Sequence, residues 1–145
     1  MRVMVLVPAN AQTEAGVLPT TEEFAELGAY NEELVKAGIM LAGDGLHPTS
    51  KGAKVVYDKD NGTTVVDGPF TESKELIAGF WIWQVTSMDE AVEWARRAPF
   101  RPGNGETTTS VQIRPIFEAE DFGDALTPEL RAQEERQRAQ AAALQ

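Results

Sequence analysis

The chain has 145 residues, enough for one domain with a buried core, and its 42% hydrophobic and 25% charged content is typical of a globular protein. The absence of cysteine excludes disulfides, thiolate nucleophiles and cysteine-ligated metal sites. The formal net charge of -10 disfavours nucleic-acid and anionic-membrane partners, because their phosphates repel such a surface.

The first third of the chain predicts a strand, a helix and a second strand. Residues 2–7 form a short apolar run, which favours a buried strand. The run is too short for a signal peptide or a membrane span, so we expect a cytoplasmic protein. Residues 8–19 are small and polar and predict a loop. Thr20 and Glu23 form a capping box that opens a helix over residues 21–37.

The middle of the chain predicts strands. A strand that begins at residue 39 is interrupted by the glycine- and proline-containing stretch GDGLHP, residues 43–48. Residues 53–57 and 63–66 flank an Asn-Gly pair, which is a strong signal for a β-hairpin. Residues 77–86, IAGFWIWQVT, form the most strand-like run in the sequence.

The last third predicts a helix, a strand and a further helix. Ser87 and Glu90 form a second capping box, and the helix that follows stops at Pro99. The loop RPGNGE, residues 101–106, is interpreted as a turn. In residues 109–117 polar and apolar side chains alternate, which predicts a strand. Thr127 and Pro128 then open a C-terminal helix that is rich in alanine, glutamate, arginine and glutamine.

This order predicts an α+β ferredoxin-like sandwich with an inserted hairpin and a C-terminal helix. We expect one domain at residues 1–123, with residues 124–145 as a helical extension of it. The sheet face away from the helices is expected to carry Trp81 or Trp83. An apolar sheet face needs a cover, so we predict a homodimer formed through that face or through an edge strand.

His47 is the only histidine and a candidate acid–base group, because imidazole titrates near neutral pH. Asp44, three residues earlier, can orient it if the chain turns between them. A loop histidine beside a proline is the alternative interpretation. With one histidine and no cysteine, the sequence lacks the ligand spacing of a zinc site, and we predict no metal and no cofactor.

The stretch Asp67-Gly68-Pro69-Phe70 is the second candidate site. Gly68 and Pro69 predict a rigid turn, and Phe70 can plug the core. An aspartate held beside an apolar wall can serve as a general acid or base. Asp67 can equally cap the turn through its own backbone, so site and turn both stay open.

Residues 66–75, VDGPFTESKE, together with Gly79 and Phe80 resemble the signature of the DGPF proteins, a branch of the YCII-related family. The resemblance continues in the N-terminal strand, in residues 33–48 and from residue 88 onward. It implies a ferredoxin-like fold of the dimeric α/β-barrel type, with two subunits packed sheet against sheet. Relatives resemble muconolactone isomerases, and DGPF proteins are often encoded beside extracytoplasmic-function sigma factors.

The resemblance has one departure. Smaller YCII proteins carry a histidine on the first helix that is proposed to act with an aspartate, and residues 21–37 of this chain contain no histidine. His47 and Asp67 are candidates for a replacement pair.

Two functional hypotheses follow. The first is a lyase or isomerase that moves protons on a small molecule, with Asp67 as base and His47 as acid. Phe70, Trp81 or Trp83 would wall its pocket, and Lys74 would hold an anionic group. The second is a non-catalytic ligand-sensing or protein-interaction module linked to a sigma-factor system. The predicted ligand-binding residues are Gly68, Pro69, Phe70, Lys74, Asp44, Trp81 and Trp83.

Overall fold

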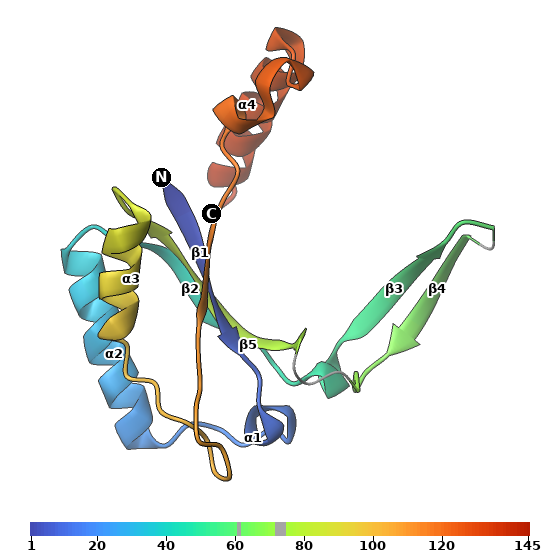
Figure 1. Cartoon of the computed structure of the whole chain (residues 1–145). Helices are drawn as coiled ribbons and strands as arrows, with labels where there is room; N and C mark the ends of the chain where they lie inside the picture. The colour runs from blue at the N-terminus through green and yellow to red at the C-terminus, as the bar shows by residue number, and fades with distance from the viewer. Residues whose placement is uncertain (61, 72–74) are drawn as a thin grey trace. The chain divides into compact units, whose positions relative to one another are not determined.

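A computed structural model describes residues 1–60, 62–71 and 75–145 (Figure 1). The chain divides into two compact units, Met1–Pro115 and Ile116–Gln145, and each is described by itself. The boundary predicted after residue 123 falls inside the second unit. Lys74 lies outside the described residues.

The first unit is built on a four-stranded sheet in the order β2-β5-β1-β6. Every neighbouring pair in it is antiparallel, and the sheet is open rather than closed into a barrel. Helices α2 and α3 cover one face (Figure 1). This arrangement confirms the predicted ferredoxin-like α+β fold. The strands are β1 (Arg2–Pro8), β2 (Met40–Gly45), β5 (Ile77–Gln84) and β6 (Gln112–Pro115).

The predicted hairpin is also present, as a separate two-stranded sheet between β2 and β5. Its strands are β3 (Ala53–Asp58) and β4 (Gly62–Asp67). The helical elements of the chain are α1 (Ala11–Glu14), α2 (Thr21–Lys36), η1 (Thr49–Lys51), α3 (Met88–Arg96), η3 (Ala119–Ala125) and α4 (Pro128–Ala142), where η marks a 3₁₀-helix.

Side-chain caps set the starts of the two covering helices. At α2 the Thr20 hydroxyl accepts from the Glu23 amide, and the Glu23 carboxylate accepts from the Thr20 amide at 2.8 Å, as predicted. At α3 the Ser87 hydroxyl caps Glu90, but the Glu90 carboxylate reaches one residue further back, to the amide and hydroxyl of Thr86. The Thr86 backbone hydrogen bond, helped by its hydroxyl, lowers the pKa of Glu90.

Two segments differ from the prediction. The predicted loop at residues 8–19 contains the short helix α1, because Asn10 and Thr13 cap each other's backbone amides. The last strand is Gln112–Pro115 rather than residues 109–117, because β1 pairs with it only over Val3–Leu6.

The core lies between the sheet and its two helices. Val3, Val5, Leu34 and Trp83 are fully buried there. Edge-on and tilted ring contacts add to it: the Trp81 ring centroid lies 5.9 Å from that of Tyr30, 5.8 Å from that of Trp83 and 5.7 Å from that of Phe100. A side chain at Gly43 would collide with the Trp81 indole, so this position on β2 requires glycine.

A polar contact at Tyr30 joins the two helices over the core. The Tyr30 hydroxyl donates to the Trp94 carbonyl at 2.7 Å, and Arg97 pairs with Glu33 beside it. The Arg97 guanidinium also lies 4.2 Å from the centre of the Trp94 ring. Burial raises the pKa of Tyr30 to about 12.

The second unit consists of η3 and α4. The rings of Phe117 and Phe122 stack at 5.1 Å, and Arg131 of α4 pairs with Glu120 at 3.6 Å. Thr127 caps α4 and Pro128 is its first residue, as predicted. No residue of α4 is buried.

Replacing Tyr30 by phenylalanine tests the helix–helix contact. At pH 7 the variant should lose about 1 kcal/mol of unfolding free energy, because the Trp94 carbonyl loses its donor. Since the folded pKa of Tyr30 lies above its unfolded value, its contribution is present below about pH 10 and is lost toward pH 12. Urea unfolding should therefore show the gap between wild type and Tyr30→Phe closing over that range. A constant gap would contradict the assignment.

Candidate functional site at the base of the hairpin

The Asp-Gly-Pro-Phe stretch closes the base of the β3–β4 hairpin. Asp67 is the last residue of β4 and pairs with Ala53, and the Gly68 amide then donates to the Gly52 carbonyl at 3.0 Å. The Gly68–Pro69 peptide bond is cis. A side chain at Gly68 would overlap the carbonyl of Thr49, so the turn and η1 are in direct backbone contact.

Thr49 is the centre of a small hydrogen-bond network at this base. Its hydroxyl accepts from the Phe70 amide at 3.0 Å and donates to the Glu14 carboxylate at 2.6 Å. Glu14 also accepts from the Thr49 amide at 3.2 Å. The Phe70 ring is half-buried, with the Lys54 ammonium 4.5 Å from its centre. The network joins α1, η1 and the turn.

Sequence reasoning missed Glu14 and Thr49. Glu14 belongs to a segment that was predicted to be a loop, and its partner lies 35 positions along the chain. A carboxylate at the end of a short helix and a threonine after a proline carry no pairing signal of their own. Their contact depends on how the chain returns past α1.

The predicted acid–base residues lie on two adjacent segments. His47 lies two positions before the start of η1 at Thr49, and Asp67 precedes the glycine that packs on Thr49. Both side chains are exposed. Among the described residues no hydrogen bond joins them, and the Asp67 carboxylate does not cap the amides of its own turn. Asp67 is an exposed residue at the end of β4.

Asp44 lies on the uncovered face of the sheet. The register aligns it with Phe80 on β5, and Phe80 with Leu6 on β1. The next row aligns Ala42, Ile82, Met4 and Arg114. Asp44 is exposed, whereas Phe80, Leu6, Ile82 and Met4 on the same face are half-buried.

The prediction that Trp81 or Trp83 faces away from the helices was wrong. Both indoles point toward the helices, with exposed fractions of 5% and 0%. The Trp81 indole donates to the Asn31 side chain at 3.0 Å, whereas Trp83 Nε1 is buried without a hydrogen-bond partner among the described residues. Side chains two positions apart on one strand point to the same face of the sheet. Neither tryptophan can therefore line a pocket on the face away from the helices.

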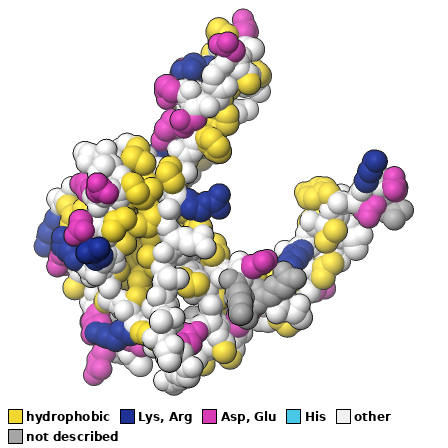
Figure 2. Space-filling model, viewed as in Figure 1, with side chains coloured by type: hydrophobic (Ala, Val, Ile, Leu, Met, Phe, Trp, Pro, Cys, Tyr) yellow, Lys and Arg dark blue, Asp and Glu magenta, His cyan; other side chains and the backbone are white. Residues whose placement is uncertain are grey.

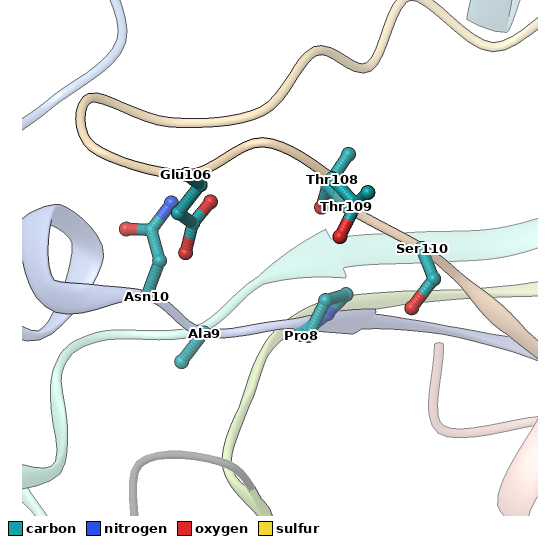
Figure 3. Close-up of a pocket in the computed structure, with 7 residues that line it drawn as sticks. All are labelled: Pro8, Ala9, Asn10, Glu106, Thr108, Thr109 and Ser110. Atoms are coloured by element: carbon teal, nitrogen blue, oxygen red, sulfur yellow. The ribbon is translucent and has the colours of Figure 1, made fainter.

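A separate polar depression lies at the end of β1. It is a cavity of about 240 Å³ between residues 8–10 and the loop that leads to β6 (Figure 3). Asn10 and Glu106 stand at one end of it and Ser110 at the other (Figure 3). The oxygens of Asn10 and Glu106 already accept backbone amides, from Thr13 and Gly103. Some polar atoms that line the depression are therefore already used in hydrogen bonds within the adjoining loops.

Two general properties bear on the site. No helix in the described part of the chain combines the length and apolar character needed to cross a membrane. Within the same residues, no three histidine or carboxylate side chains gather as metal ligands would.

Comparison with known proteins identifies the family. The model of the YCII-related domain matches residues 1–118. The chain belongs to the YCII-related family. An uncharacterized protein of Rhizobium meliloti (strain 1021) is 33% identical over 91 residues, which cover 63% of this chain and 70% of that protein. The family match over residues 1–118 takes in all four strands of the main sheet and the hairpin, so the candidate site lies inside the YCII-related domain.

Replacing Thr49 by valine tests the network. The change removes both the acceptor of the Phe70 amide and the donor to Glu14 while keeping the shape of the side chain. Hydrogen exchange at the Phe70 amide should become roughly fivefold faster, because a hydrogen bond contributes about 1 kcal/mol to local stability. Thr49→Ser keeps the hydroxyl and should exchange as wild type does. Equal exchange in all three proteins would show that the hydroxyl does not hold the turn.

Proposed function

We propose that this YCII-related protein is a member of the DGPF branch that binds a small molecule beside the Asp-Gly-Pro-Phe turn. It acts on that molecule by proton transfer, as a lyase or an isomerase. The observation that carries the proposal is the contact between Gly68 and Thr49, which holds the segment with Asp67 against the segment with His47. Both side chains are exposed beside that contact and remain available to a ligand.

Each residue has a role that follows from its chemistry. Asp67 is the general base, because among the described residues its carboxylate makes no hydrogen bond to the turn. His47 supplies the proton or orients the ligand. Phe70 provides an apolar wall, and Asp44, which lies opposite Phe80 on the main sheet, is proposed as a further ligand contact. Lys74, outside the described residues, is proposed to hold an anionic group of the ligand.

The proposed protein is a homodimer that closes the uncovered sheet face. Met4, Leu6, Phe80 and Ile82 are only half-buried on that face in a single chain. A second subunit packed on these side chains would remove them from water, and burial of apolar area is the main driving force of association. The ligand would then lie at the edge of a closed, drier space.

Because His47 is the only histidine, its imidazole signals are unique in an NMR spectrum. We expect small aromatic or enolic carboxylic acids to shift these signals on binding. Replacing Asp67 by asparagine should slow deuterium exchange at the acidic C–H of a bound ligand by at least 100-fold, because general-base catalysis typically contributes 10² to 10⁴. His47→Gln should slow it as well.

Asp60→Asn provides the matched control, because Asp60 is an exposed carboxylate at the opposite end of the same hairpin. It should leave both binding and exchange unchanged. The proposal fails if ligands that bind leave the His47 signals unmoved, or if Asp67→Asn and wild type exchange the ligand's proton at the same rate.

A second candidate function uses the C-terminal helix. Every residue of α4 is at least partly exposed, so its surface is available to a partner. Because the chain resembles DGPF proteins, we propose an extracytoplasmic-function sigma factor as that partner. A chain ending at Gly123 should then lose binding to a purified sigma factor of this class from the same organism, measured by calorimetry. Binding that survives the truncation would remove α4 from the interaction.

A further inference from the structure

The β3–β4 hairpin exposes apolar side chains that no described residue of the Met1–Pro115 unit covers. Every residue of both strands that the structure describes is exposed, including Val55 at 51%, Tyr57 at 80% and Val65 at 66%. Figure 2 shows these hydrophobic side chains along the hairpin. A two-stranded hairpin alone is marginally stable, and its outer strands leave backbone donors and acceptors unpaired.

We propose that the free edge of β3 pairs with β3 of a second copy of this chain, antiparallel, about a twofold axis at Val56. The result is a four-stranded sheet made from two hairpins. This contact differs from the homodimer contact proposed above for the main sheet, because it uses residues of β3 rather than residues of β1 and β5.

The charged residues of β3 favour the register with the twofold axis at Val56. When Val56 lies opposite its own counterpart, Lys54 lies opposite the second copy's Asp58, and the twofold axis repeats this pair on the other side. Val55 then lies opposite the second copy's Tyr57. Opposite charges and an aliphatic–aromatic pair are the cross-strand neighbours that stabilise antiparallel sheets. All side chains that meet this way share a face, as antiparallel pairing requires.

Neighbouring registers lose this complementarity. An axis at Val55 places Lys54 opposite a valine and moves Asp58 beside Gly52. An axis at Tyr57 places Asp58 opposite Val56, and it sets Lys54 opposite Asp60, which lies beyond the end of β3. The other edge of the hairpin cannot form such pairs either, since β4 contains no lysine or arginine. The β3 edge with the axis at Val56 is therefore the self-complementary solution.

Charge reversal tests the pairing in the full chain. Lys54→Asp sets two aspartates against each other and Asp58→Lys sets two lysines, so each variant should self-associate about tenfold more weakly than wild type in sedimentation experiments. An equimolar mixture of the two restores both opposite-charge pairs and should recover association. The double variant Lys54→Asp/Asp58→Lys should recover it as well.

Recovery separates the proposed contact from local damage. Lys54→Asp also removes the cation from the Phe70 ring, and neither the mixture nor the double variant can repair that loss. Association that stays weak in both would overturn the proposal, and so would single variants that associate like wild type.

A cysteine at position 56 tests the axis directly, because the natural chain has none. Opposed residues of antiparallel strands have Cα atoms about 4.5 to 5.5 Å apart, within the range of a disulfide. Under mild oxidation by a glutathione buffer, Val56→Cys should give a covalent dimer on a non-reducing gel. Thr64→Cys, directly across the hairpin on the same face, should stay monomeric on the gel. Equal yields from both, or a dimer from Thr64→Cys alone, would refute the proposed edge.

Discussion

The alternation of side chains along β1 and β5 is the constraint on which the main unit depends. Both central strands are apolar on both faces, so covering one face with α2 and α3 leaves the other in contact with water. Val3, Val5, Trp81 and Trp83 take the covered side. Met4, Leu6, Phe80 and Ile82 are thereby assigned to the other side by geometry alone. These four residues are only half-buried, and this supports the proposed subunit contact.

The hydrogen bonds of Thr49 link the hairpin to the rest of the main unit. It connects α1, which follows the central strand, to the base of a hairpin that has no strand partner in the main sheet. Because Gly68 meets the Thr49 backbone directly, the turn leaves no room for a side chain there. The signature stretch therefore has a structural role in its glycine and in the Phe70 amide. Its aspartate is not used by that role and remains the group for which a chemical function is proposed.

The sequence predicted helix starts and turns well where the interactions that set them lie within a few residues of each other. The capping box at Thr20, the proline after Thr127 and the glycine of the hairpin turn act within a few residues, and each element begins or turns where they stand. The prediction failed at α1, where a loop-like composition concealed the reciprocal cap of Asn10 and Thr13. It also failed at Trp81 and Trp83, because periodicity shows that two residues share a face and does not say which face the helices take.

The sequence by itself determined the ferredoxin-like order of strands and helices, the inserted hairpin and the rigid turn at residues 67–70. These depend on periodicity, caps and backbone restrictions that act over a few residues. Only the tertiary structure decided which apolar face α2 and α3 cover, that Thr49 and Glu14 contact the turn, and that Asp67 is an exposed residue. Those outcomes depend on contacts between segments tens of residues apart, which no local pattern encodes.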